Sequence, residues 1–161
     1  MAKKIYVHEG VHRSGTSSFQ ICLGQNCDLL ETRGFDLAYP GRDGAPQGKL
    51  KLRFPGRKED EGKVAVMAKR AAHNIAIATS DPARDLILSE ENIPGRIYPM
   101  FKGRLFPDAS KRAGIMRMAL GGGLTIFLSF CGLVQICSYR LNGRGRKTTR
   151  CDLVQRLCRT C

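Results

Sequence analysis

Residues 5–20 read IYVHEGVHRSGTSSFQ, and the interpretation of the chain starts from their order. The first three residues, 5–7, are β-branched or aromatic, as is typical of a buried strand. Gly10 and Gly15 then bracket four residues, after which apolar residues recur at helical spacing. The stretch therefore predicts a strand, a glycine-bracketed loop and a helix over about 16–33.

The loop and the start of this helix have the properties of an anion-binding site. First-turn N–H groups have no partner within a helix, and the helix dipole makes that end positive. Glycines allow the backbone to close around an oxyanion. Hydroxyl donors and one guanidinium stand at the same place: Arg13, Ser14, Thr16, Ser17 and Ser18. We predict a cradle for a phosphate-like group; the alternative is a glycine-rich turn that only packs.

The glycine spacing resembles a Walker A loop, G-x-x-x-x-G-K-[ST], except that Thr16 stands where the lysine should be. The cation is instead Arg13, inside the loop. This variant resembles the 5′-phosphosulfate loop of sulfotransferases, whose core reads roughly (P/H)-(K/R)-(S/T)-G-(T/S)-(T/S). The matching residues are His12, Arg13, Ser14, Gly15, Thr16 and Ser17, and a later Y-P-G at 39–41 extends the resemblance.

The resemblance implies a fold and an activity. The fold would be α/β, a P-loop-type three-layer arrangement of a parallel sheet flanked by helices. The activity would be sulfuryl transfer from 3′-phosphoadenosine 5′-phosphosulfate (PAPS) to a hydroxyl or amine of a small-molecule or glycan acceptor. Residues 12–17 would hold the 5′-phosphosulfate, and Arg13 would stabilise the charge that develops at in-line attack on sulfur. Enzymes of this family need no metal.

A second polar cluster follows the apolar run 86–88, which predicts a short buried strand. Ligands in open parallel sheets bind beyond the carboxyl ends of strands, so this cluster should face the same crevice as the glycine loop. The family has a similar strand ending in S-x-E. Glu90 or Glu91 is therefore a candidate general base, ahead of His8 and His12. The compatible alternative is that Ser89 caps the start of a helix.

Three further elements are predicted from periodicity and punctuation. Helices are expected over 61–78 and 111–120, and a buried strand over 124–130. Between 41 and 62 the chain is rich in glycine, proline and charge, which predicts a loop. The alternating KLKLRF segment within it, 49–54, predicts one short exposed strand.

Composition limits the partners and the compartment. The chain has 161 residues and a net charge of +13, but its basic residues form no stripe interleaved with aromatics, which argues against nucleic acid. Lys3 and Lys4 precede only three apolar residues, so no signal peptide is predicted and a cytoplasmic location is expected. The composition says nothing about oligomeric state.

Two other functional classes remain open. A P-loop kinase or nucleotide-binding protein would need Mg²⁺, and the missing lysine at Thr16 argues against it. A non-enzymatic, tail-anchored membrane protein is suggested by residues 118–139, which carry no charge. Glycines, a glutamine and hydroxyls within this run weaken membrane insertion, so a membrane association is not favoured.

The resemblance stops after Phe130. The family would next show a strand ending in arginine and a serine eight positions later, which grip the 3′-phosphate of PAPS. Residues 131–161 instead contain seven basic residues, one acidic residue and five cysteines. When the codons from Cys131 onward are read in a shifted frame, they allow an arginine and a serine that are eight positions apart. We therefore expect a partial sulfotransferase-like domain at 1–130, an out-of-frame tail at 131–161, and impaired or absent activity.

Overall fold

The computed structural model describes residues 3–10, 15–56, 58–81, 83–96, 98–104, 106–121, 124–129 and 137–140. Strands and helices alternate along most of this length, which is the pattern of an α/β protein. In chain order the elements are β1 (Ile5–Gly10), α1 (Thr16–Gln25), α2 (Cys27–Thr32), β2 (Phe35–Ala38), β3 (Pro40–Arg42), β4 (Ala45–Lys49), α3 (Glu61–Ala78), β5 (Asp85–Ser89), the 3₁₀ helix η1 (Tyr98–Lys102), α4 (Ala109–Leu120), β6 (Leu124–Ser129) and β7 (Cys137–Arg140).

The main sheet has the strand order β2-β5-β1-β6-β7. β1 lies at its centre and pairs in parallel with β5 and with β6, so that Ile5 is opposite both Leu86 and Leu124. β2 is parallel to β5, and β7 is antiparallel to β6 at the edge. The predicted α/β class with a parallel sheet is confirmed, and so are the predicted strands at 5–7 and 86–88.

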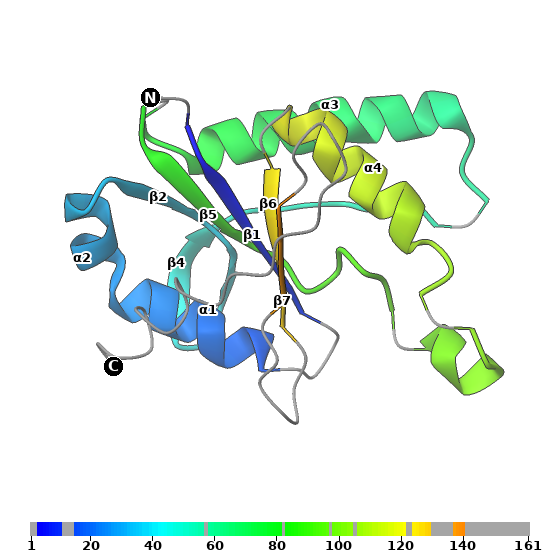
Figure 1. The fold of residues 1–161 in the computed structure, drawn as a ribbon, viewed down its shortest axis with the longest axis horizontal. Coiled ribbons are helices and arrows are strands. Elements are labelled where there is room, and N and C mark those ends of the chain that lie inside the picture. Colours follow the sequence, from blue (N-terminus) through cyan, green and yellow to red (C-terminus); the bar gives the residue numbers. More distant parts are fainter. Residues whose placement is uncertain are drawn as a thin grey trace.

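Helices cover both faces of the sheet, with α3 and α4 on one side and α1 and α2 on the other (Figure 1). The alternation along β5 explains how one apolar strand serves both faces. Leu86 and Leu88 belong to the core cluster that includes Ile75 of α3 and Met116 of α4. Ile87 belongs to the opposite cluster, with Leu23 of α1 and Leu30 of α2.

The helix predicted over 16–33 begins at Thr16 but is divided in two. α1 ends at Gln25, and α2 begins at Cys27. The residue between them, Asn26, donates from its side-chain amide to the Cys22 carbonyl oxygen at 2.9 Å. Asparagine side chains compete with the helical backbone in this way, which accounts for the break. The helix predicted over 61–78 is confirmed, with Asp60 accepting from the Lys63 N–H at 2.8 Å as its N-cap.

The strand predicted in the KLKLRF segment is wrong. Within the described residues, 50–56 form no ladder, and the strands of this region are β3 and β4, which pair antiparallel with each other. The alternation instead reflects packing: Leu50, Leu52 and Phe54 contact the core on the α3 side. An extended segment can bury every second side chain without pairing to another strand in a sheet.

The uncharged run at 118–139 is not one helix where it is described. It contains the end of α4, the strand β6 and most of β7. Across the described part of the chain, no helix combines the length and the apolar character needed to cross a membrane. The remainder of the predicted tail lies outside the described residues.

Candidate functional site

The first turn of α1 begins at a glycine and carries exposed hydroxyls. Its N-cap is Gly15, at φ 81° and ψ 7°, and this residue has no side chain with which to accept from the first-turn amides. A Cβ built on Gly15 would have no atom of the described residues within 4 Å. Thr16 is 2% exposed, whereas Ser17 and Ser18 are exposed. The described start of α1 thus has the open, positive end that an anion site requires.

A guanidinium lies beside this turn. Arg42, the last residue of β3, donates from Nη1 to the Ser17 hydroxyl oxygen. Its Nη2 lies 3.8 Å from Glu91 Oε1, and both side chains are 21% exposed. The Nε of Arg42 is buried and has no hydrogen-bond partner among the described residues. Arg42 therefore links Ser17, at the helix start, with Glu91, beyond the end of β5, and keeps one donor unused.

The β3–β4 hairpin holds Arg42 in this position. Gln47 of β4 donates from its side-chain amide to the Gly24 carbonyl oxygen of α1 at 2.7 Å. The sequence analysis did not single out Arg42. The Y-P-G segment at 39–41 directly precedes Arg42, but no local sequence pattern indicates that the β3–β4 hairpin folds back along α1.

A buried polar network joins β1, β5 and α1 below this surface. His8 and Ser89 are opposite each other in the parallel register, and His8 Nδ1 lies 2.9 Å from the Ser89 hydroxyl oxygen. Gln20, which is fully buried, donates from its amide to the Ser89 hydroxyl at 3.1 Å and to the Ser89 carbonyl at 3.2 Å. The His8 ring lies against Phe19, with centroids 4.2 Å apart. Burial lowers the pKa of His8 to about 4, so its imidazole is neutral at pH 7.

Glu90 is buried, at 4% exposed, and organises the turn after β5. Its Oε1 accepts from the Asn92 backbone N–H at 2.9 Å and from the Asn92 side-chain amide at 2.8 Å. Burial, the larger effect, raises the pKa of Glu90 in spite of these bonds. The helix-capping interpretation of Ser89 is wrong, because the described residues 90–96 form turns and the Ser89 hydroxyl is engaged by His8 and Gln20.

A third carboxyl group stands at the same sheet edge. Glu9 follows His8 on β1, and burial raises its pKa from 4.5 to about 7. Because successive strand residues point to opposite faces, Glu9 faces the α3–α4 side while His8 faces α1. The sequence analysis gave Glu9 no role, and only the strand alternation could have indicated its burial.

The structure brings part of the predicted site together. Gly15, Thr16 and Ser17 lie at the start of α1, and Glu90 and Glu91 follow the neighbouring strand end, with Arg42 between Ser17 and Glu91. The predicted residues His12, Arg13 and Ser14 lie outside the described residues. Among the residues that are described, no group of three His, Cys, Asp or Glu side chains is arranged to hold a metal ion.

Comparison of the chain with protein-family models, with curated proteins and with solved structures found no match. A function for this chain can therefore be proposed only from the geometry of the site and from the sequence of the glycine-bracketed loop.

Proposed function

We propose that this chain is a sulfotransferase-like protein of P-loop type that binds PAPS at the start of α1 and transfers the sulfuryl group to a hydroxyl or amine. The observation that carries the proposal is the position of Arg42. Its guanidinium donates to Ser17 in the first turn of α1. The N-cap of this helix, Gly15, has no side chain that could accept from the first-turn amides, and a Cβ built on it would meet no described atom within 4 Å. A cation next to the first-turn amides of a helix is suited to an anionic donor.

The proposed reaction needs little from the protein beyond charge and orientation. The acceptor oxygen or nitrogen attacks sulfur, the bond from sulfur to the phosphate oxygen breaks, and 3′-phosphoadenosine 5′-phosphate leaves. Negative charge grows on the leaving phosphate, where first-turn amides, Ser17 and Arg42 would stabilise it. Arg13 stays a proposed second cation. Arg42 would exchange its contact with Glu91 for one with the donor.

The acceptor proton needs a base, and Glu90 and Glu91 are the proposed candidates. The raised pKa of Glu90 brings it closer to neutral pH, as general-base catalysis favours. Its Oε1 is committed to Asn92, so only the other oxygen could take a proton. Glu91 is more accessible, at 21% side-chain exposure, and its Oε1 lies 3.8 Å from Arg42 Nη2.

Ligand-dependent stabilisation tests the proposal directly. 3′-Phosphoadenosine 5′-phosphate should raise the melting temperature of the purified chain, and ATP with Mg²⁺ should not. Arg42→Gln should weaken binding of 3′-phosphoadenosine 5′-phosphate about 10- to 100-fold, as expected from the loss of one charged hydrogen bond. Arg53→Gln is the matched control, because Arg53 is exposed and lies outside the site.

The outcomes separate the functional classes. Stabilisation by ATP with Mg²⁺ alone would favour the kinase or nucleotide-binding alternative, for which Glu90 at a strand end would be the metal-side acid. Equal weakening by Arg42→Gln and Arg53→Gln would show only a general effect of charge. Stabilisation by neither nucleotide would remove the cradle from consideration.

We also propose that residues 131–161 are translated out of frame and that donor binding is impaired as a result. The frame-shifted codons allow the arginine and the serine that would hold the 3′-phosphate. Sequencing the gene across codon 130 checks this. The out-of-frame hypothesis would be wrong if the reading frame is intact and no shifted frame encodes a sulfotransferase-like sequence. That result would not affect the proposed site at α1.

A further inference from the structure

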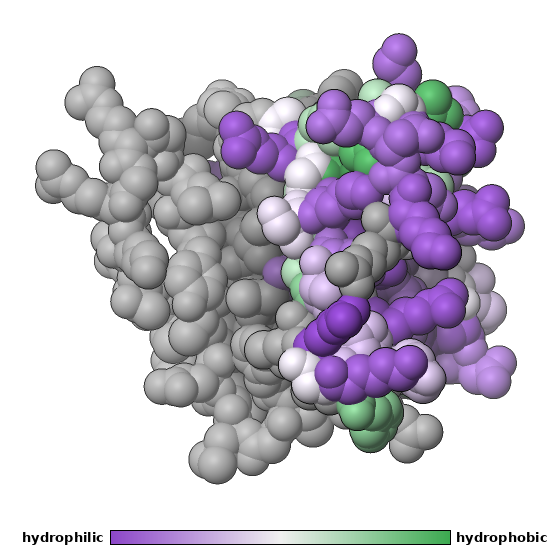
Figure 2. Space-filling view, turned by 90° about the vertical axis from the view of Figure 1, so that its right-hand side faces the viewer, coloured by the Kyte–Doolittle hydropathy of each residue, from purple (hydrophilic) through white to green (hydrophobic). Residues whose placement is uncertain are grey.

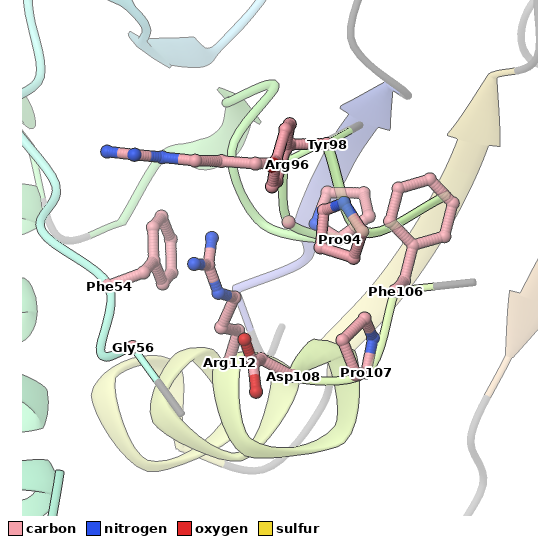
Figure 3. A pocket seen from close by; sticks show the side chains of 11 residues that line it. Phe54, Gly56, Pro94, Arg96, Tyr98, Phe106, Pro107, Asp108 and Arg112 are labelled. Atoms are coloured by element: carbon pink, nitrogen blue, oxygen red, sulfur yellow. The ribbon is translucent and has the colours of Figure 1, made fainter. Parts of the chain in front are cut away.

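A second cavity lies beyond the end of β5. It has a volume of about 400 Å³ and is enclosed by residues 54–56, the turn after β5 and the start of α4 (Figure 3). Cavities of this size accommodate small organic molecules. None of its described lining residues comes from β1 or α1, so it is separate from the cradle.

A buried arginine forms one wall. Arg112 of α4 is 8% exposed, and its Nη1 donates to the Asn92 carbonyl oxygen at 2.8 Å. Its Nε is buried and lacks a hydrogen-bond partner within the described part of the chain. No carboxylate of those residues forms an ion pair with it. Burial lowers the pKa of this guanidinium, whereas the charge of Asp108 acts in the opposite direction.

A second guanidinium faces the same space. Arg96 is exposed and lines the cavity, and its charge also lowers the pKa of Arg112. In Figure 3, Arg112 points from α4 toward Phe54, and Arg96 extends across the opposite side. The only acidic residue in the described lining is Asp108. Two cations and one carboxylate leave the described lining with a net positive charge, although Asp108 partly balances the charge of Arg112, and an anionic ligand would balance the rest.

The remaining walls are rings. The Cζ atom of Arg112 lies over the Phe54 ring, 5.8 Å from the ring centroid. Pro94, Tyr98 and Phe106 line the other sides. Such walls favour flat, apolar groups. The side of the molecule that carries η1 is otherwise mostly hydrophilic where it is described (Figure 2).

We propose that this cavity binds a small planar anion, namely an aromatic ring that carries a carboxylate. The carboxylate lies between Arg96 and Arg112, and the ring packs against Phe54. This site goes beyond the proposed sulfuryl transfer and requires neither PAPS nor catalysis.

Binding of 2-naphthoate to the full chain tests the proposal, with the neutral 2-naphthamide as the matched ligand. The naphthoate should bind saturably, and the amide at least about tenfold more weakly, because it lacks the charge. Arg96→Ala should weaken naphthoate binding about tenfold. Arg104→Ala should leave it within about twofold, since Arg104 is exposed nearby but does not line the cavity.

Three results would overturn the proposal. One is equal affinity for naphthoate and naphthamide, and another is equal weakening by Arg96→Ala and Arg104→Ala. The third is displacement of naphthoate by 3′-phosphoadenosine 5′-phosphate, which would make the cavity part of a nucleotide site. Competition by inorganic phosphate only at far higher concentration than naphthoate would support the contribution of the ring.

Discussion

Replacement of Gly15 by alanine should have two separable effects. Gly15 has φ 81°, a conformation that costs a residue with a Cβ about 1–2 kcal/mol. The lower chain entropy of unfolded alanine offsets part of this, by about 0.4–1 kcal/mol. A net loss near 1 kcal/mol corresponds to a fall of about 2–4 °C in melting temperature for a domain of this size. Among the described residues the new methyl group meets no atom within 4 Å, so they add no steric term.

Gly34 provides a matched control. It has φ 84°, and a Cβ there would likewise have nothing within 4 Å, but it lies beyond α2 and away from the start of α1. Gly34→Ala should therefore cost the same stability as Gly15→Ala. Only Gly15→Ala places a methyl group where the donor's phosphate is proposed to sit, and it should weaken binding of 3′-phosphoadenosine 5′-phosphate at least about tenfold.

Thermal unfolding and calorimetric titration of both variants measure the two effects separately. If both variants lose stability equally and bind the nucleotide as the wild type does, the space in front of Gly15 is not a ligand site. If Gly15→Ala loses no stability, the backbone conformation assigned to the N-cap of α1 is incorrect.

Two further predictions concern buried polar groups. Ser89→Ala removes a hydroxyl that Gln20 and His8 both contact, so urea unfolding should show a loss of about 1–3 kcal/mol. The pKa of Glu9 is raised from 4.5 to about 7, so the contribution of Glu9 to stability falls as pH rises from 4.5 to 7. The pKa of His8 is lowered from 6.5 to about 4, so the contribution of His8 to stability rises from pH 4 to 6.5. Glu9→Gln should therefore be more stable than the wild type at pH 8 by up to about 3 kcal/mol; a variant that is no more stable there would contradict the burial of this carboxyl.

Local signals were sufficient for most of the fold. The runs 5–7 and 86–88 contain consecutive apolar residues with few alternatives to a buried strand. The prediction of the helix 61–78 is confirmed to the residue: a Ser-Asp-Pro sequence marks its end, and the structure shows Asp60 capping its start. The failures occurred where a local pattern had two physical causes, as at 49–54, where alternate burial arose from packing without strand pairing.

The site was less predictable than the fold. The positions of Ser17 and Glu91 follow from strand and helix order, but Arg42 reaches them only because the β3–β4 hairpin packs on α1. The contact between His8 and Ser89 requires the register of β1 against β5. Both depend on residues far apart in sequence, which periodicity and composition do not relate.

The central position of β1 has a consequence for biosynthesis. This strand is synthesised well before both of its neighbours in the sheet, β5 and β6. Until then its backbone N–H and C=O groups have no partner within the sheet, and the nascent chain carries an apolar segment that invites association with chaperones or with other unfinished chains. Pairing of β1 should therefore be slow, since the contacts of the sheet close long loops.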